Sequence, residues 1–247
     1  MQEEVRGRWI YIPYHEEVPV TFQIGMVGSD GVLLASDRLH TQFSPYRNRF
    51  LSDKISVHED IGLAYCCTGD DLTTIVMQHV LGSVRADRKW PIELHLSTGV
   101  DRALEGLASR SKQGVLERPL RRGSVLAVYR ASRAVQLWKF DIDVELSKQL
   151  PAYLIENHCC IGDDVNAASF FVERYFDNNH KVPLAHLAQL AAHTVLMAGA
   201  TNPTGVDGLD IVLCTQEGFT PIDEKELSCL KQQSAELNSH ISAVLLG

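Results

Sequence analysis

The chain lacks any hydrophobic run of the roughly 20 residues that a membrane-spanning helix needs, and its N-terminus lacks the apolar core of a signal peptide. Basic residues are also in short supply, since 23 Lys and Arg face 31 Asp and Glu, for a formal net charge of -8. This balance disfavours nucleic-acid binding, because phosphate contacts need clustered lysine and arginine. These absences predict a soluble, cytoplasmic protein with neither nucleic acid nor membrane among its partners.

Metal-ligand spacing is absent as well. Neighbours on a strand point to opposite faces, so neither adjacent cysteine pair supplies two ligands to one zinc ion. His186 and His193 share a helix face, but no acidic residue completes a metal site beside them. We predict reduced thiols, most of them buried, and no metal or cofactor. The cysteines are Cys66, Cys67, Cys159, Cys160, Cys214 and Cys229.

The chain has enough apolar residues to form a sizeable core. The chain has 247 residues, 45% of them hydrophobic, which favours one large domain over two small ones. Residues 1–20 follow neither a helical nor a strand period, so we interpret them as a leader or propeptide, or as the product of a mis-assigned start. The predicted domain spans residues 21–247.

Hydrophobic periodicity divides this domain into alternating blocks. Strands are predicted at 21–27, 32–39, 54–58, 61–67, 124–130, 135–140, 152–161, 209–215 and 218–222. Helices are predicted at 70–86, 91–110, 163–176, 183–199 and 224–245. Two antiparallel sheets packed face to face between helical layers would bury every apolar stripe. The predicted fold class is therefore α+β, as a four-layer α-β-β-α sandwich.

The first hairpin determines which polar side chains can meet. If Gly31 occupies a left-handed bulge position in a three-residue loop, Gly28 faces Val32 and Gln23 faces Asp37. Thr21 and Asp37 then lie on one face as diagonal neighbours, roughly 7 to 8 Å apart. A shift of one residue would send them to opposite faces, so the prediction depends on this turn.

Lys54 can bridge that gap. Its ammonium favours a developing alkoxide on Thr21, while Asp37 keeps the lysine charged. The base is better supplied by an α-amino group, because its reference pKa of about 7.7 to 8.0 suits neutral pH and that of lysine, about 10.4, does not.

The element order resembles that of the 20S proteasome subunit family, an N-terminal nucleophile hydrolase fold, and in particular its bacterial β-type homologues. The resemblance covers residues 21–247 and rests on Gly25, Asp30-Gly31, Ala35, Asp37 and Gly69-Asp70. It implies a threonine-type peptidase or amidohydrolase whose N-terminal threonine, aspartate and lysine match Thr21, Asp37 and Lys54. The interval from Thr21 to Lys54, 33 residues, is one longer than the family has.

Further roles follow from the resemblance alone. The family's catalytic serine falls on Asp163 and its late aspartate on Asn202, while the backbone N–H of Cys66 takes the oxyanion-hole position. The substrate pocket would be lined by His40, Ala64, Thr68 and Leu72. The family also implies a homo-oligomeric ring, and it leaves open peptide or small-amide substrates, and hydrolysis or acyl transfer.

Activity requires a free amine on Thr21 and so the loss of residues 1–20. One route is autocatalytic cleavage after Val20, although that branched residue crowds the attack. The other is translation from a GTG codon at position 20, followed by removal of the initiator methionine.

Two other functions compete. The chain can be a non-catalytic, ring-forming structural subunit of α type that retains its N-terminal extension, or a thiol-dependent enzyme that uses Cys66 or Cys67. Taken singly, Thr21 is an ordinary β-former, Asp37 a turn cap and Lys54 an exposed edge charge. Their coincidence favours the hydrolase.

Overall fold

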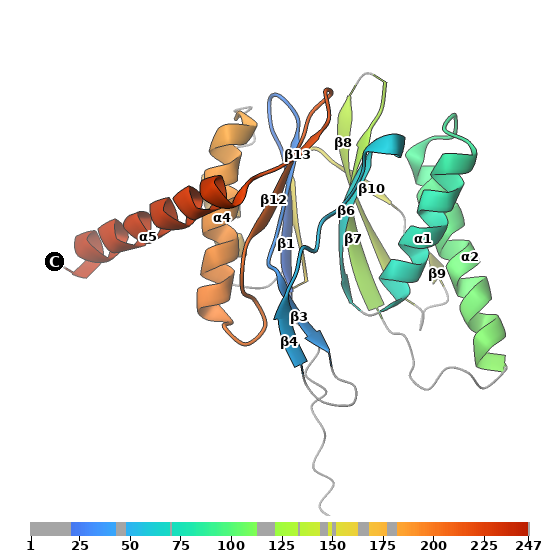
Figure 1. Ribbon diagram of the computed structural model, residues 1–247, viewed down its shortest axis with the longest axis horizontal. Helices are drawn as coiled ribbons and strands as arrows, with labels where there is room; N and C mark the ends of the chain where they lie inside the picture. Colours follow the sequence, from blue (N-terminus) through green and yellow to red (C-terminus); the bar gives the residue numbers. More distant parts are fainter. Residues whose placement is uncertain are drawn as a thin grey trace, which may run out of the picture.

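The computed structural model describes residues 21–42, 48–69, 71–112, 122–132, 134–143, 148–149, 152–162, 168–176 and 182–246. The predicted leader, residues 1–20, lies outside these ranges. The fold class is α+β, as predicted, with helices packed on antiparallel sheets (Figure 1). Among the described helices, none combines the length and the apolar character that a bilayer crossing requires.

One sheet carries the N-terminal strand. Its order is β11 (His158–Gly162), β1 (Phe22–Val27), β2 (Val32–Ser36), β12 (Asp210–Cys214) and β13 (Phe219–Pro221), with every neighbouring pair antiparallel. β1 and β2 are buried along almost their whole length, because both faces of this sheet are covered.

The second sheet has the order β10 (Tyr153–Ile155), β8 (Val135–Asp143), β7 (Arg122–Arg130), β6 (Leu63–Gly69) and β5 (Ser56–His58), with β9 (Lys148–Gln149) paired to β8. A 3-10 turn, η1 (Glu59–Ile61), joins β5 to β6. A separate ribbon of β3 (Leu39–Gln42) and β4 (Asn48–Leu51) extends beyond the two sheets (Figure 1).

The two sheets face each other across a shared apolar core. Leu34 of β2, Leu126 of β7 and Leu137 of β8 are fully buried within it. The approach is close at Gly25, where an added Cβ would come within 2.8 Å of the Leu137 side chain. This core is what joins the two sheets into one unit.

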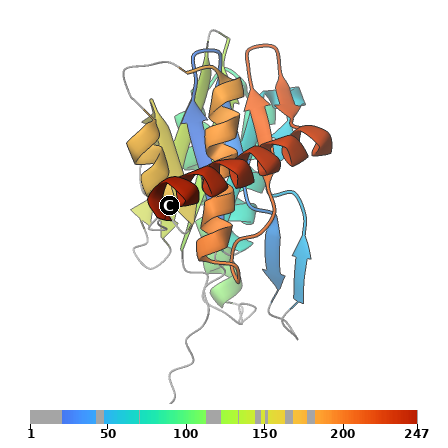
Figure 2. The same cartoon turned by 90° about the vertical axis from the view of Figure 1, so that its left-hand side faces the viewer.

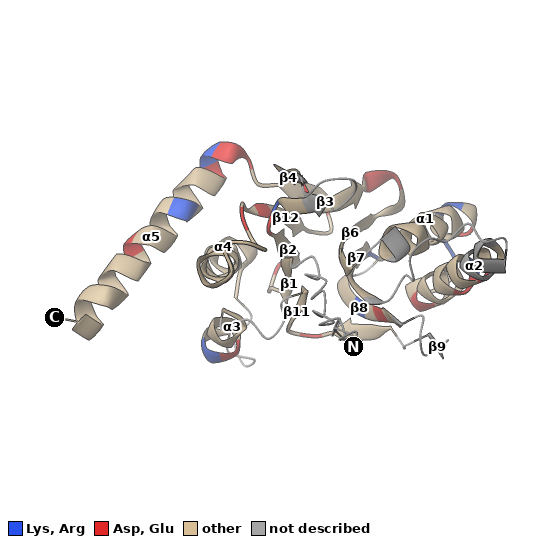
Figure 3. Ribbon diagram, turned by 90° about the horizontal axis from the view of Figure 1, so that it is seen from below, with Lys and Arg blue, Asp and Glu red and all other residues tan. Residues whose placement is uncertain are grey.

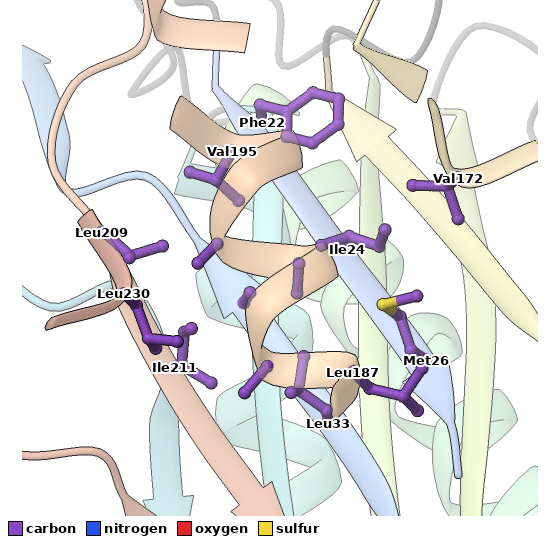
Figure 4. Packing of buried hydrophobic residues seen from close by; sticks show 14 of the residues in the cluster. Phe22, Ile24, Met26, Leu33, Val172, Leu187, Val195, Leu209, Ile211 and Leu230 are labelled. Atoms are coloured by element: carbon purple, nitrogen blue, oxygen red, sulfur yellow. The ribbon is translucent and has the colours of Figure 1, made fainter. Parts of the chain in front are cut away.

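Helices cover the outer faces of both sheets. α1 (Asp71–Ala86) and α2 (Ile92–Lys112) pack on the six-stranded sheet, and α3 (Ser169–Tyr175), α4 (Leu184–Thr201) and α5 (Glu224–Leu246) on the five-stranded one. Seen from below, α3 and α4 lie on one side of the two sheets, and α1 and α2 lie on the other (Figure 3). Figure 4 shows the packing under α4, where Phe22, Ile24 and Leu33 meet Leu187 and Val195.

α5 crosses α4 (Figure 2). Leu227 and Leu230 are buried in the core, and Ser234 lies 2.9 Å from His193 Nδ1. Beyond that contact the helix leaves the body of the protein, and Val244 to Leu246 are exposed (Figure 1).

Most predicted elements match the observed ones, but the ribbon of β3 and β4 was not predicted. A further error concerns residues 152–161. The single strand predicted at 152–161 is two strands, because the chain bends at Glu156-Asn157 and passes from one sheet to the other. β10 pairs with β8, whereas β11 pairs with β1. Local hydrophobicity cannot reveal such a crossing, since both strands are apolar and only their partners differ.

The close approach at Gly31 yields a stability prediction. A Cβ at this position would lie 2.3 Å from the Cys214 carbonyl oxygen, so the Gly31→Ala chain must shift its backbone. We expect the free energy of unfolding to fall by about 1 to 3 kcal/mol in urea denaturation.

Gly82→Ala is the matched control, since no described atom lies within 4 Å of a Cβ added there and the residue sits inside α1. This variant should gain about 0.5 to 1 kcal/mol. Equal stability of Gly31→Ala and the unmodified protein would contradict the packing described for this turn.

Candidate active site

Thr21 immediately precedes β1 and is nearly buried, with 8% of its surface exposed. Its hydroxyl donates a hydrogen bond to Asp37 Oδ1 and accepts one from Lys54 Nζ at 2.6 Å. The structure therefore brings together the three residues that the sequence singled out, from three separate segments of the chain.

Asp37 is the centre of this cluster. Its side chain is fully buried, and Oδ1 accepts from the Thr21 hydroxyl and from the Phe22 N–H at 2.9 Å. Oδ2 accepts from the Leu39 N–H at 3.0 Å and from Lys54 Nζ at 2.7 Å. Four donors thus offset the cost of burying the carboxylate.

The hairpin that was expected to align Thr21 with Asp37 has a different register. Gln23 pairs with Ser36, not with Asp37, and Val27 pairs with Val32. Gly31 is extended, with φ of 159°, and the Gly28 N–H donates to its carbonyl at 2.8 Å. The predicted three-residue bulged loop was wrong.

Thr21 and Asp37 nevertheless meet, because β2 ends at Ser36. Beyond the ladder the alternation of faces no longer sets the direction of a side chain. The Asp37 backbone still donates to the Phe22 carbonyl at 3.1 Å, which keeps the two chain segments together. The carboxylate reaches the threonine directly and does not depend on a bridging lysine.

Lys54 lies in an irregular segment before β5, which begins at Ser56 and not at Lys54 as predicted. Its side chain is 8% exposed. Burial lowers the pKa of Lys54, and the charge and hydrogen bond of Asp37 oppose that shift. Asp37 therefore offsets part of the desolvation of the ammonium, which also donates to the Thr21 hydroxyl.

The backbone of Gly162 packs closely against that of Thr21. Gly162 pairs with Phe22, and a Cβ at this glycine would lie 2.1 Å from the Thr21 carbonyl oxygen. Only glycine permits this approach, the more so because its φ is 93°. Asp163, the predicted partner of the amine, follows directly and lies outside the described residues.

Three other predicted site residues lie on β6. Cys66, Ala64 and Thr68 point from β6 toward the core between the sheets, and Ala64 has no exposed surface. Burial raises the pKa of Cys66 well above its ordinary value, which makes this thiol a poor nucleophile. Leu72 lies in α1, and its side chain is outside the description.

His40 stands on β3 and stacks on Phe50 of β4, with ring centroids 5.2 Å apart. Burial and the charge of Lys54 lower the pKa of His40, so the ring is neutral at physiological pH. Asn202 ends α4, and its amide oxygen accepts from the Thr204 hydroxyl at 3.3 Å.

Two residues near the site had no predicted role. Gln23 is fully buried and its Nε2 donates to the Cys67 carbonyl at 3.2 Å, while Oε1 has no hydrogen-bond partner among the described residues. Arg38 forms ion pairs of 3.0 Å with Asp53 and Glu224. The sequence carried a signal for Gln23, which is a polar residue inside the apolar run of β1. It carried no such signal for Arg38.

Within the described ranges, no three potential His, Cys, Asp or Glu ligands come together as a metal site. The described cysteines form no disulfide; Cys66 and Cys214 are buried, and Cys229 is exposed. The chemistry that this site can support is that of a hydroxyl hydrogen-bonded to both a carboxylate and an ammonium.

Comparison with known proteins supports the fold. No protein-family model and no curated protein matches the chain. Among solved structures, Anbu (ancestral beta-subunit) from Yersinia bercovieri has a TM-score of 0.63 at 15% identity, over 90% of this chain and 97% of that one. The Anbu (Gly-1) mutant from Hyphomicrobium sp. strain MC1 has a TM-score of 0.63 at 13% identity, over 90% and 96%. The chain shares the fold of Anbu.

This finding corrects the resemblance proposed from the sequence. The structural relatives are Anbu proteins, which are proteasome-like but distinct from the 20S subunits to which the chain was compared, so that assignment was wrong. The motif positions failed to separate the two, because small residues at tight turns are required by the fold that both share.

The cluster predicts the effect of removing the buried charge. In Asp37→Asn, Lys54 loses the interactions that oppose its desolvation, so its pKa should fall further below the ordinary value. We expect this shift in an NMR titration of the Lys54 side chain, together with a loss of about 3 kcal/mol of stability.

Asp53→Asn provides the control, since this carboxylate is 69% exposed and its ion pair with Arg38 is partly solvated. Its stability cost should stay below about 1 kcal/mol. Equal effects of the two substitutions would show that Asp37 is not the charge that holds Lys54.

Proposed function

We propose that the chain is a threonine-type peptidase or amide hydrolase, with Thr21 as its nucleophile after the loss of residues 1–20. The observation that carries the proposal is the Thr21 hydroxyl, held by Lys54 at 2.6 Å and by Asp37 at the buried end of β1. Helices packed on antiparallel sheets also support the proposal of a four-layer N-terminal nucleophile hydrolase fold.

Acylation is the first step. The Thr21 α-amine takes the hydroxyl proton as Oγ1 attacks the substrate carbonyl carbon, and the Lys54 ammonium stabilises the oxygen that loses its proton. The C–N bond of the substrate then breaks. The leaving nitrogen takes the proton from the α-ammonium, and the acyl group remains on Thr21 as an ester.

Deacylation uses the same amine. It removes a proton from water, which attacks the ester carbonyl, and returns a proton to Oγ1 as the acid leaves. The proposal assigns the oxyanion to the backbone N–H of Cys66, and support of the amine to Asp163 and Asn202. Asp37 takes up no proton in this scheme, and its carboxylate accepts four hydrogen bonds.

The substrate is proposed to be a peptide or small amide, bound in the pocket that the sequence assigned to His40, Ala64, Thr68 and Leu72. Acyl transfer to another nucleophile in place of water follows the same first step. The neutral His40–Phe50 stack offers an apolar, aromatic wall for a side chain of the substrate.

We also propose that the protein is cytoplasmic. We further propose that it is a homo-oligomer, because the exposed apolar end of α5 would be covered by a second copy. Light scattering that returns the mass of a single chain at micromolar concentration would count against this assembly.

The leading experiment compares chains that begin at Thr21. A threonine-directed covalent inhibitor should add one equivalent of mass to the chain with a free Thr21 amine and none to Thr21→Ala. Lys54→Met should lower the rate of labelling by about 100- to 1,000-fold, because the alkoxide loses its positive neighbour. Intact mass spectrometry measures both.

The full-length chain supplies the second arm. With Thr21 nitrogen held in a peptide bond, labelling should be absent until residues 1–20 are lost. Equal labelling of Thr21→Ala would remove the catalytic assignment. Native protein that retains residues 1–20 and never reacts would favour the non-catalytic structural subunit.

A further inference from the structure

Gln23 is a polar residue buried between the two sheets. It lies on β1, two residues beyond Thr21, and none of its surface is exposed. Its side chain reaches the second sheet, where Nε2 donates to the Cys67 carbonyl of β6 at 3.2 Å. An amide buried among apolar side chains costs free energy, so its presence at this place needs a physical reason.

The alternation of side chains along β1 aims Gln23 at the six-stranded sheet. Phe22 and Ile24 point to the opposite face, where they pack under α4 (Figure 4). A Cβ on Gly25 would point the same way as the Gln23 side chain and would meet Leu137 of β8. The one polar side chain of β1 is therefore directed at the facing sheet, and it ends on a backbone carbonyl there.

That carbonyl lies where β6 has a strand on one side only. β5 pairs with β6 from Leu63 to Tyr65. Among the described residues, those of β6 beyond Tyr65 pair with β7 alone. A strand with a free edge is held less firmly than one inside a sheet, because part of its backbone has no ladder partner. The Gln23 amide gives this edge a donor from the facing sheet.

The position of this contact relates it to the candidate site. Cys67 lies between the two β6 residues that the proposed function uses, Cys66 for the oxyanion and Thr68 for the pocket. Thr21 lies roughly 7 Å along the chain from Gln23. The core between the sheets is otherwise rich in apolar contacts, which are non-directional and permit small shifts of one sheet on the other. A hydrogen bond resists such a shift.

The amide adds little net stability. Its Oε1 is buried and has no hydrogen-bond partner among the described residues. This unmet acceptor offsets the gain from the Nε2 hydrogen bond, so an apolar side chain of the same length would fill the space at a similar free energy. The Cys67 carbonyl would then lose this donor. What the amide contributes is the placement of β6.

We infer that Gln23 is a positioning residue, whose amide holds the Cys67 peptide of β6 at a fixed place relative to Thr21. The inference rests on the proposed function for its effect on the reaction rate, and on the described geometry alone for the contact. Removal of the amide should therefore slow the chemistry without destabilising the fold.

Gln23→Met is the variant that tests the inference, because Met keeps the length of the side chain and removes both amide groups. Gln232→Met is the matched control, since Gln232 is exposed on α5 and its Nε2 donates to Glu236 at 2.8 Å. Ile24→Val is a second control, because Ile24 is fully buried on the other face of β1 and a lost methylene leaves a cavity there.

The first readout is the contact itself, in the full chain. With cysteine labelled by 13C at its carbonyl, Gln23→Met should move the Cys67 resonance upfield and leave that of Cys229 on α5 in place. In the unmodified protein, the Nε2 protons of Gln23 should exchange with solvent at least about tenfold more slowly than those of Gln232, because only the first amide is buried.

The second readout is labelling by the threonine-directed inhibitor, in the chain that begins at Thr21. Gln23→Met should lower kinact by about ten- to hundredfold, because the nucleophile is misplaced against the strand that holds the inhibitor. KI should stay the same, since an inhibitor bound on β6 moves with that strand. The urea midpoint should also stay the same. Gln232→Met should match the unmodified protein, and Ile24→Val should lower the midpoint with kinact unchanged.

An unchanged kinact in Gln23→Met would overturn the inference, and so would a Cys67 resonance that does not move. A lower kinact that Ile24→Val reproduces would also overturn it, since the cause would then be a general loss of packing. If Gln23→Met does not fold, amide exchange in the unmodified protein decides the contact, and Gln23 protons that exchange as fast as those of Gln232 overturn it. A chain beginning at Thr21 that never reacts removes the proposed function, and the Cys67 resonance still decides the contact.

Discussion

The buried carboxylate of Asp37 is the interaction on which the rest of the site depends. A buried carboxylate must be matched by donors, and its four donors are Thr21, Phe22, Leu39 and Lys54. Each donor restrains the element that carries it, so β1, the start of β3 and the lysine segment converge on one point. The same carboxylate opposes the desolvation of Lys54, which allows a charged lysine to remain in a nearly dry site.

The packing of the two sheets imposes the second constraint. A Cβ at Gly25 would lie 2.8 Å from the end of the Leu137 side chain, and a Cβ at Gly162 would lie closer still, 2.1 Å from the Thr21 carbonyl oxygen. These approaches make the end of β1 a rigid platform, on which a hydroxyl can be held within hydrogen-bond distance of two partners. Around it stand less regular segments, and contacts of Arg38 with Ser52 and Asp53 hold the segment that carries Lys54 in place.

Periodicity predicted most of the elements because each amphipathic stripe reports its own buried face. α1, α4 and α5 begin or end within two residues of their expected bounds for this reason. The pairing of the strands was predicted less well. The register of β1 on β2 was missed by one residue, and the strand expected at 152–161 divides between two sheets. The first error concerns the turn of a local hairpin, whose length sets the register. The second concerns a change of partner strand, which no local pattern specifies.

By itself the sequence determined the α+β class and the identity of Thr21, Asp37 and Lys54, because strand periodicity and scarce polar residues in apolar runs are local properties. Only the tertiary structure decided how the three meet. Asp37 reaches Thr21 because β2 stops at Ser36, and Lys54 arrives from a segment that no ladder holds.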